Sequence, residues 1–138
     1  MKTMAVLCDL DGTLAVIGDR SPYNADDCGL DQVNPAVASV LDWARAAGYA
    51  IVLVSGRGIK ASHRTYTEQW LTWNGIEYDE LLMRRPGDER PDHVVKAEIY
   101  EHRIRRRYDV FFIMDDRRDV VAMWRSLGLT VFQVDDRV

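Results

Sequence analysis

The sequence lacks several features that define common classes of protein. Its 138 residues include only two cysteines, Cys8 and Cys28, too few for a disulfide framework, so we expect both thiols to be free in a reducing compartment. No apolar run approaches the roughly 20 residues that span a bilayer. Met1 leads within a few residues into a predicted strand, and no signal peptide is visible. We therefore expect a cytoplasmic protein that does not bind membranes.

Three further absences limit the chemistry. The histidines His63, His93 and His102 show no paired ligand spacing, and two cysteines cannot complete a zinc site. No GxxxxGK[ST] motif is present, so P-loop kinase activity is not expected. The net charge is −4, which argues against coating nucleic acid by bulk charge but allows a local basic groove.

Strand-like and helix-like segments alternate through the whole chain. Short apolar runs predict buried strands at 4–7, 49–54, 81–83, 110–114 and 129–134. Helical periodicity predicts helices at 35–47, 62–73, 92–106 and 118–127. This alternation predicts one α/β domain over residues 1–138, with a Rossmann-like parallel sheet flanked by helices.

Local signals add detail to this outline. Asn34-Pro35 is typical of a helix start, with Asn34 as the N-cap and Pro35 at the first helical position. The preceding segment, 14–34, is rich in Gly, Asp, Asn and Pro and has no period, so we expect a loop or short flap over the strand ends. The aromatic stripe Tyr66, Trp70 and Trp73 could form a base-stacking platform, but at helical spacing we interpret it as core.

The stretch Cys8-Asp9-Leu10-Asp11-Gly12-Thr13 follows the first predicted strand. Because side chains alternate along a strand, Asp9 and Asp11 should leave its end on one side. Two carboxylates held close repel each other unless a cation or a proton lies between them. Such a pair can supply one carboxylate as a nucleophile and the other as an acid–base group. Taken alone, the stretch could equally be a calcium-loop fragment or a polar turn.

Polar residues also follow the other predicted strands. Ser55, Gly56 and Arg57 come after the second strand, and Asp115 and Asp116 come after the fourth. Ligands of open parallel sheets bind beyond the carboxyl ends of the strands, so these groups should converge with Asp9 and Asp11 on one rim. A serine hydroxyl, a glycine N–H and an arginine can hold phosphate, although Ser-Gly-Arg-Gly by itself is more often a plain turn.

Two further predictions concern charge at this rim. We place Lys96 in the first turn of a helix capped by Asp92, from where it could reach a phosphate; a solvated lysine is the ordinary alternative. The carboxylates of Asp9, Asp115 and Asp116 would form an oxygen-rich pocket of the kind that Mg²⁺ prefers.

At these residues the sequence resembles the haloacid dehalogenase (HAD) superfamily of phosphatases. The four motifs are Asp9 to Thr13, Ser55, Lys96 and Asp115-Asp116, in matching order and spacing across the chain. The resemblance is closer still to the 3′-phosphatase domain of bacteriophage-type polynucleotide kinase/phosphatase. The segments that carry it are Arg20-Ser21-Pro22-Tyr23, Val33-Asn34-Pro35, Val52 to Arg57, Val94-Val95-Lys96, Asp115-Asp116-Arg117 and Met123-Trp124-Arg125.

The resemblance implies roles for the motif residues. Asp9 would attack phosphorus to form an aspartyl-phosphate, and Asp11 would act as acid and then as base. Mg²⁺ would be held by Asp9, the backbone carbonyl of Asp11 and Asp116, with Asp115 bound through water. The residues implied for the phosphate oxygens are Thr13, Ser55, Gly56, Lys96 and, close by, Arg57.

Substrate contacts are expected in two regions. No insertion is long enough for the large cap of small-molecule phosphatases, so an open site that admits a polymer end is expected, with Arg84, Arg85 and Arg90 tracking a nucleic-acid backbone. The resemblance adds Arg20, Tyr23 and Arg117. The basic run 103–107 ends a helix, where cations suit the dipole, and we interpret it as a solvated face.

The predicted function is removal of 3′-phosphate from DNA or RNA ends by an Mg²⁺-dependent phosphatase, in the host cytoplasm if the protein is phage-encoded. A superfamily phosphatase acting on small phosphate esters is the alternative, and a binding module without turnover is disfavoured because Asp9 and Asp11 are both present. The kinase half of the two-domain enzymes is missing from this sequence, so 5′-kinase activity should be absent unless a separate chain provides it; a kinase or a ligase on a separate chain is an expected kind of partner. A 2′,3′-cyclic phosphodiesterase activity is implied by family resemblance alone.

Overall fold

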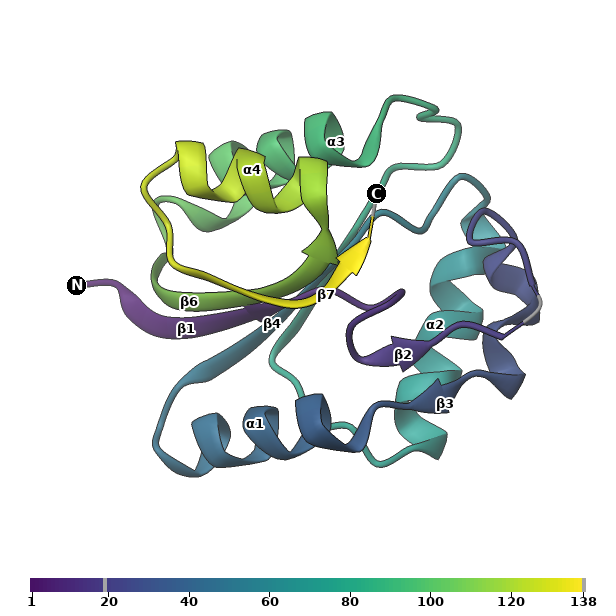
Figure 1. Cartoon of the computed structure of the whole chain (residues 1–138), viewed down its shortest axis with the longest axis horizontal. Helices are drawn as coiled ribbons and strands as arrows, with labels where there is room; N and C mark the ends of the chain where they lie inside the picture. The colour runs from purple at the N-terminus through teal and green to yellow at the C-terminus, as the bar shows by residue number, and fades with distance from the viewer. Residues whose placement is uncertain (19, 138) are drawn as a thin grey trace.

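A five-stranded parallel sheet forms the centre of the molecule (Figure 1). The computed structural model describes residues 1–18 and 20–137. The strands lie in the order β5-β4-β1-β6-β7, and each neighbouring pair is parallel. Their bounds are Thr3–Cys8 (β1), Ala50–Ser55 (β4), Glu80–Met83 (β5), Tyr108–Arg117 (β6) and Val131–Arg137 (β7). The predicted α/β class with a Rossmann-like parallel sheet is confirmed.

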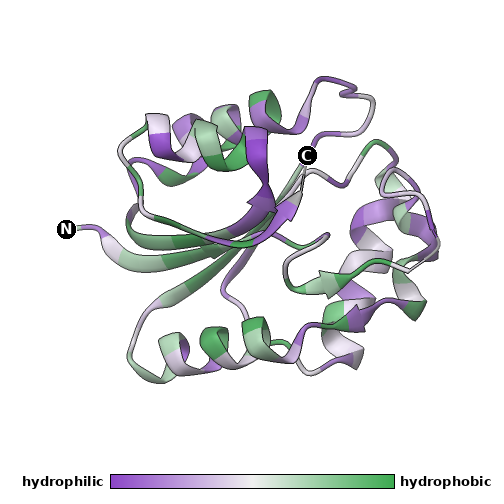
Figure 2. Ribbon diagram, viewed as in Figure 1, coloured by the Kyte–Doolittle hydropathy of each residue, from purple (hydrophilic) through white to green (hydrophobic). Residues whose placement is uncertain are grey.

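Helices cover both faces of this sheet. Helices α3 (Asp92–Ile99) and α4 (Arg118–Ser126) lie on one face, and α1 (Pro35–Ala46) lies on the opposite face (Figure 1). Helix α2 (Ala61–Trp73) packs beside the segment that follows β1, and a π-helical turn, Tyr100–Ile104, continues α3. The middle parts of the strands carry mostly hydrophobic residues (Figure 2), and the core on the two faces of the sheet forms two buried clusters.

Alternation along β1 divides the core into two clusters. Val6 and Cys8 pack with Trp70 on the side of α1 and α2, whereas Ala5 and Leu7 pack on the side of α3 and α4. These four side chains are fully buried, whereas Thr3 and Met4, at the start of β1, are exposed. Burial on both faces fixes the register of β1, and therefore fixes the position at which Asp9 leaves the sheet.

The described part of the segment 14–34, which leaves out residue 19, contains more regular secondary structure than the predicted loop. It forms a hairpin of β2 (Ala15–Val16) and β3 (Gln32–Val33), with a 3₁₀ turn, Ala25–Leu30, between the strands. The 3₁₀ turn packs on α2, where the Trp70 indole N–H donates to the Asp31 carbonyl at 2.9 Å. Within the described residues, this small flap is the element that covers the strand ends, and no large cap is present.

Several local predictions are confirmed. Asn34 caps α1, because its side-chain oxygen accepts the Ala36 N–H at 3.1 Å and Pro35 occupies the first turn. Both cysteines are free and buried. Over the described residues, no helix is long and apolar enough to cross a bilayer.

Two predictions about helices are wrong. Asp92 does not cap α3: it is the first helical residue, the cap position belongs to Pro91, and Lys96 consequently lies in the second turn. Of the aromatic stripe on α2, only Trp70 is core, whereas Tyr66 is 43% and Trp73 is 70% exposed. The 3₁₀ turn of the flap covers one side of α2 and leaves the sides that carry Tyr66 and Trp73 in solvent.

Candidate active site

The carboxyl ends of β1 and β6 bring three aspartates together. Asp9 follows β1 directly, and Asp115 and Asp116 lie near the end of β6, which pairs with β1. One carboxylate oxygen from each residue lies within 4.8 Å of the others, and all three side chains are buried. The predicted convergence of distant acidic residues on one rim is therefore present.

Lys96 lies at the centre of this cluster and is itself buried. Its Nζ donates to Asp9 Oδ1 at 2.7 Å and to Asp115 Oδ2 at 3.0 Å, so the solvated-lysine interpretation does not hold. Burial alone would lower the pKa of Lys96, but the carboxylates of Asp115 and Asp9 raise it above its usual value, and the side chain stays charged. One lysine thus faces three carboxylates.

The cluster carries more negative charge than the chain neutralises. Burial, and then the Asp115 carboxylate, raise the pKa of Asp9 well above its usual range. Burial likewise raises the pKa of Asp116. A site built only of carboxylate oxygens, with an excess of buried negative charge, fits a hard divalent cation such as Mg²⁺.

Two neighbours shape the cluster. The Thr13 hydroxyl lies 3.1 Å from Asp9 Oδ2 and 3.2 Å from Asp116 Oδ1 and bridges the two carboxylates. Gly12 has a φ of +84°, and a Cβ at this position would lie 2.1 Å from Asp116 Oδ2. Only glycine therefore combines this turn with the close approach of Asp116.

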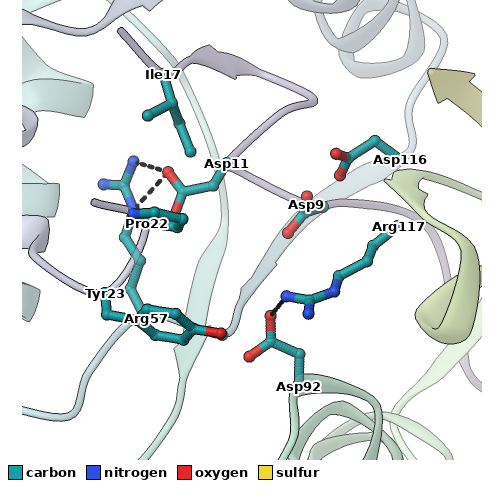
Figure 3. A pocket seen from close by; sticks show the side chains of 10 residues that line it. Asp9, Asp11, Ile17, Pro22, Tyr23, Arg57, Asp92, Asp116 and Arg117 are labelled. Atoms are coloured by element: carbon teal, nitrogen blue, oxygen red, sulfur yellow. Dashed lines mark hydrogen bonds and ion pairs between the residues drawn. The ribbon is translucent and has the colours of Figure 1, made fainter. Parts of the chain in front are cut away.

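The Asp11 side chain lies outside the three-carboxylate cluster. Arg57 holds it from Nε at 3.0 Å and from Nη2 at 2.5 Å (Figure 3). Arg20 also donates to it, from Nη2 at 2.8 Å. Burial would raise the pKa of Asp11, but Arg57 and then Arg20 outweigh it and lower the pKa below its usual value. Asp11 is therefore held as a carboxylate, and a metal contact through its backbone carbonyl stays a prediction.

A fifth acidic residue, Asp31, completes this network and was missed at the sequence level. Its carboxylate accepts Arg20 Nε at 3.0 Å and Nη2 at 2.6 Å, and Arg57 Nη2 at 3.4 Å. Thr67 on α2 accepts Arg57 Nη1 at 3.1 Å. Arg20 and Arg57 were expected at substrate and phosphate, and here they orient Asp11. No sequence signal separates Asp31 from the other acidic residues of the flap.

The turn after β4 forms a further side of the site. Ser55 is buried, and its Oγ accepts the Arg57 N–H at 3.1 Å. A Cβ at Gly56 would lie 2.5 Å from Asp92 Oδ1, so glycine is required for Asp92 to approach. Asp92 in turn accepts Arg117 Nη1 at 3.1 Å, which links this turn to the end of β6.

Arg84 does not occupy the expected position on the surface. It is 5% exposed, and its guanidinium donates to the Gly56 carbonyl at 2.7 Å and to Asp92 Oδ1 at 2.6 Å. It also donates to the carbonyls of Asp88 and Arg90. The prediction that Arg84 tracks a nucleic-acid backbone is wrong, because these protein groups occupy its donors. Arg85 and Arg90, on the same loop, are exposed.

These groups surround a cavity of about 230 Å³ at the rim of the sheet (Figure 3). The acidic cluster lies on one side, and the flap closes the other side with apolar surface. The lining residues are Asp9, Asp11, Ile17, Pro22, Tyr23, Gly56, Arg57, Asp92, Asp116 and Arg117. The cavity therefore joins a polar, acidic floor to a wall that an organic group can contact.

Fold and site together define a phosphatase of the HAD type. A model of the polynucleotide kinase PNKP phosphatase domain matches residues 3–137. The chain belongs to this family of phosphatase domains, and it is a phosphate-ester hydrolase.

Relatives support this assignment. A protein of Autographa californica nuclear polyhedrosis virus, described as a bifunctional polynucleotide kinase/RNA ligase, is 35% identical over an alignment of 134 residues that covers 94% of this chain and 19% of that protein. A chain in the solved Pnkp1/Rnl/Hen1 RNA repair complex is 44% identical with a TM-score of 0.94, covering 99% of this chain and 43% of that one. A second structure of the Pnkp1/Rnl/Hen1 complex gives 43% identity and a TM-score of 0.95, over 99% and 47% of the two chains.

A more distant structure shares the fold alone. A HAD-like phosphatase from Mesorhizobium loti has a TM-score of 0.61 at 16% identity, covering 93% of this chain and 70% of that one. This chain spans less than half of the length of the viral relative and of the matched chains of the repair complex.

Proposed function

We propose that this domain removes 3′-phosphates from DNA or RNA ends through an aspartyl-phosphate on Asp9. The observation that supports it most is the buried cluster of Asp9, Asp115 and Asp116 with Lys96 inside it, open to a cavity at the strand ends. Membership of a polynucleotide kinase phosphatase family supports a nucleic-acid end as the substrate. The relatives described as a kinase/RNA ligase and an RNA repair complex support a role in end healing.

Asp9 is the proposed nucleophile. One of its carboxylate oxygens would form a bond to phosphorus as the bond from phosphorus to the 3′ oxygen breaks. Lys96 holds Asp9 Oδ1 at 2.7 Å and would balance negative charge on the nonbridging phosphate oxygens, together with Ser55, Thr13 and the Gly56 N–H. Because phosphoryl transfer demands little covalent work from the protein, this charge balance would supply most of the rate.

Asp11 is the proposed acid–base group. It would donate a proton to the departing 3′ oxygen and accept one from the water that hydrolyses the aspartyl-phosphate, a service typically worth about 10²- to 10⁴-fold in rate. Its clamp by Arg57 and Arg20 orients the carboxylate toward the cavity. The lowered pKa of Asp11 favours the ionised form that accepts a proton in the second step, so the proton that Asp11 gives in the first step would have to be taken up as the substrate binds, from solvent or from the phosphate monoanion.

Mg²⁺ is the proposed metal, with Asp9 and Asp116 as direct ligands and Asp115 as an outer-sphere ligand that acts through water. Asp115 Oδ2 accepts Lys96 Nζ and the Trp124 indole N–H, and its Oδ1 accepts the Asp116 N–H, so protein donors engage both of its oxygens. The ion would supply Lewis-acid stabilisation of charge on the transferred phosphoryl group. We further propose that the domain acts in the cytoplasm, alongside a kinase or ligase that prepares or joins the ends.

The test compares a 3′-phosphorylated oligonucleotide with small aryl and sugar phosphates, with and without Mg²⁺. We expect phosphate release from the oligonucleotide only with the metal. We also expect Asp9→Asn to lose turnover while its circular dichroism spectrum is kept. A large preference for the small esters would favour the alternative function, and unchanged phosphate release by Asp9→Asn would refute the nucleophile.

A further inference from the structure

A second cavity adjoins the catalytic one. It has a volume of about 270 Å³ and shares three wall residues, Tyr23, Asp92 and Arg117, with the catalytic cavity. Its other lining residues are Ile59, Arg84, Glu89, Arg90 and Pro91. A ligand whose phosphate lies at Asp9 can therefore extend past Tyr23 into this second space without crossing the protein surface elsewhere.

Tyr23 stands at the junction. It comes from the flap, is 62% exposed, and its hydroxyl points toward Asp92 and Arg117 (Figure 3). The hydroxyl therefore lies at the polar side of the junction, and the aromatic ring is an exposed flat surface between the two cavities.

Arg90 presents a second flat surface. Its Nε and Nη2 donate to Asp88 at 3.0 and 2.7 Å, and its Nη1 donates to Glu98 Oε2 at 2.8 Å. The edges of this guanidinium are therefore occupied by carboxylates, which makes Arg90 a poor phosphate ligand. Its side chain is still 47% exposed, and a braced guanidinium offers its plane for stacking.

The rest of the second cavity is suited to an uncharged, planar group. Ile59 and Pro91 contribute apolar surface, and Arg84 is held internally by backbone carbonyls and Asp92. Aromatic rings and guanidinium planes are the surfaces on which proteins stack unpaired bases, and such stacking tolerates any base.

We propose that the second cavity holds the base of the 3′-terminal nucleotide while its phosphate lies at Asp9. This inference rests on the proposed 3′-phosphatase function and assigns specificity to Tyr23, Arg90, Ile59 and Pro91. Sugar phosphates have no base to place in the second cavity. The cavity therefore favours nucleic-acid ends over such small phosphate esters. Stacking on all bases alike predicts little preference among the four terminal bases.

The experiment compares two oligonucleotides of one sequence, one with an ordinary 3′-terminal nucleotide and one with an abasic terminal residue, both 3′-phosphorylated. For the wild-type domain we expect KM to rise roughly ten- to a hundredfold for the abasic end, the range that base–aromatic stacking supports. We expect kcat to change less, because the phosphate contacts are the same in both substrates.

Variants test the assignment of residues. In Tyr23→Ala the difference in KM between the two ends should shrink several-fold, whereas Tyr23→Phe should keep it because the ring remains. Tyr66→Ala, on the exposed side of α2, removes a comparable aromatic ring away from both cavities and should leave the difference unchanged. Thermal unfolding of each variant checks that the fold is kept.

The outcomes separate the two proposals. Equal KM values for the ordinary and abasic ends in the wild-type domain would overturn the base site while leaving 3′-phosphatase activity standing. An absence of phosphate release from every 3′-phosphorylated oligonucleotide, with hydrolysis of aryl or sugar phosphates, would instead overturn the proposed function. The wild-type comparison needs no variant to fold.

Discussion

Lys96 is the residue on which the charge balance of the site depends. It is buried, and it donates to both Asp9 and Asp115. Without its ammonium group, three buried carboxylates would face one another with no opposite charge of the chain among them. Lys96 is therefore expected to affect both stability and catalysis. Its removal would lower stability because the carboxylate partners of the buried ion pairs would be left uncompensated.

Replacing Lys96 by methionine separates these effects. We expect the free energy of unfolding in metal-free buffer to fall by about 3 kcal/mol, since uncompensated carboxylates remain buried. We expect kcat to fall by about 10²-fold or more, because a fixed cation near the transferred phosphate is lost. Urea unfolding with and without Mg²⁺, and single-turnover phosphate release, measure the two losses.

The matched control is Lys60→Met, which removes an exposed lysine whose ion-pair partner, Asp26, lies 3.7 Å away. Its unfolding free energy should change by less than about 1 kcal/mol. A Lys96→Met domain that remains as stable and as active as the wild type would contradict the role assigned to the buried ammonium.

At the scale of elements, Glu80 joins three segments. It lies at the start of β5, and it accepts Arg107 Nη1 at 2.9 Å and the Tyr108 hydroxyl at 2.7 Å, the latter at the start of β6. Burial would raise the pKa of Glu80, but the hydrogen bonds from Arg107 and Tyr108 lower it below its usual value. The ionised carboxylate therefore stabilises the folded state.

This shift sets a pH dependence. A carboxyl with a lowered folded pKa contributes stability above its unfolded pKa and loses the contribution as the pH falls through the folded value. We expect Glu80→Gln to lower the free energy of unfolding at pH 7 by about 1 kcal/mol, and the deficit to vanish in acid. Urea unfolding from pH 7 to pH 3 checks this; Glu77→Gln, at a more exposed ion pair, is the control. A deficit that stays constant with pH would mean that packing, not charge, is responsible.

The elements also show what could be predicted from sequence. Strands β1, β4 and β6 were predicted because they are short apolar runs, and the polar residues after them fell on one rim because parallel strands end at one edge. Asp31 and Thr67 were not predicted, because their contacts to Arg20 and Arg57 depend on how the flap packs against α2. Arg84 was misplaced for a related reason: the carbonyls that bury it come from a loop with no periodic signal.

At the scale of the whole molecule, the acidic cluster makes stability depend on a ligand. Burial raises the pKa values of Asp9 and Asp116, so the folded domain holds these carboxylates at a cost when no cation is bound. An ion that binds only the folded state adds stability by mass action, about 2.7 kcal/mol at a concentration 100 times its dissociation constant.

We therefore expect the melting temperature of the whole domain to rise with Mg²⁺ concentration. Asp116→Asn should abolish most of this rise, because it removes one of the clustered carboxylates, and should leave the metal-free melting temperature unchanged or higher. Asp135→Asn on β7 provides a control with an equal change in net charge. Scanning calorimetry over an Mg²⁺ series distinguishes a specific site from general screening, and an equal response of both variants would argue for screening.

The contacts of Arg84 limit how the substrate preference of this enzyme can be changed by exchanging the loop 85–91. The Arg84 side chain ties the carbonyls of Asp88 and Arg90 to the carbonyl of Gly56, and the Gly87 N–H donates to the Ile59 carbonyl at 2.8 Å, so the loop and the turn beside Ser55 are held together. A transplanted loop from a relative would shift that turn unless its carbonyls matched. Residues 85–91 are therefore not an independent module, and chimaeras should exchange the loop, its arginine and the turn as one unit.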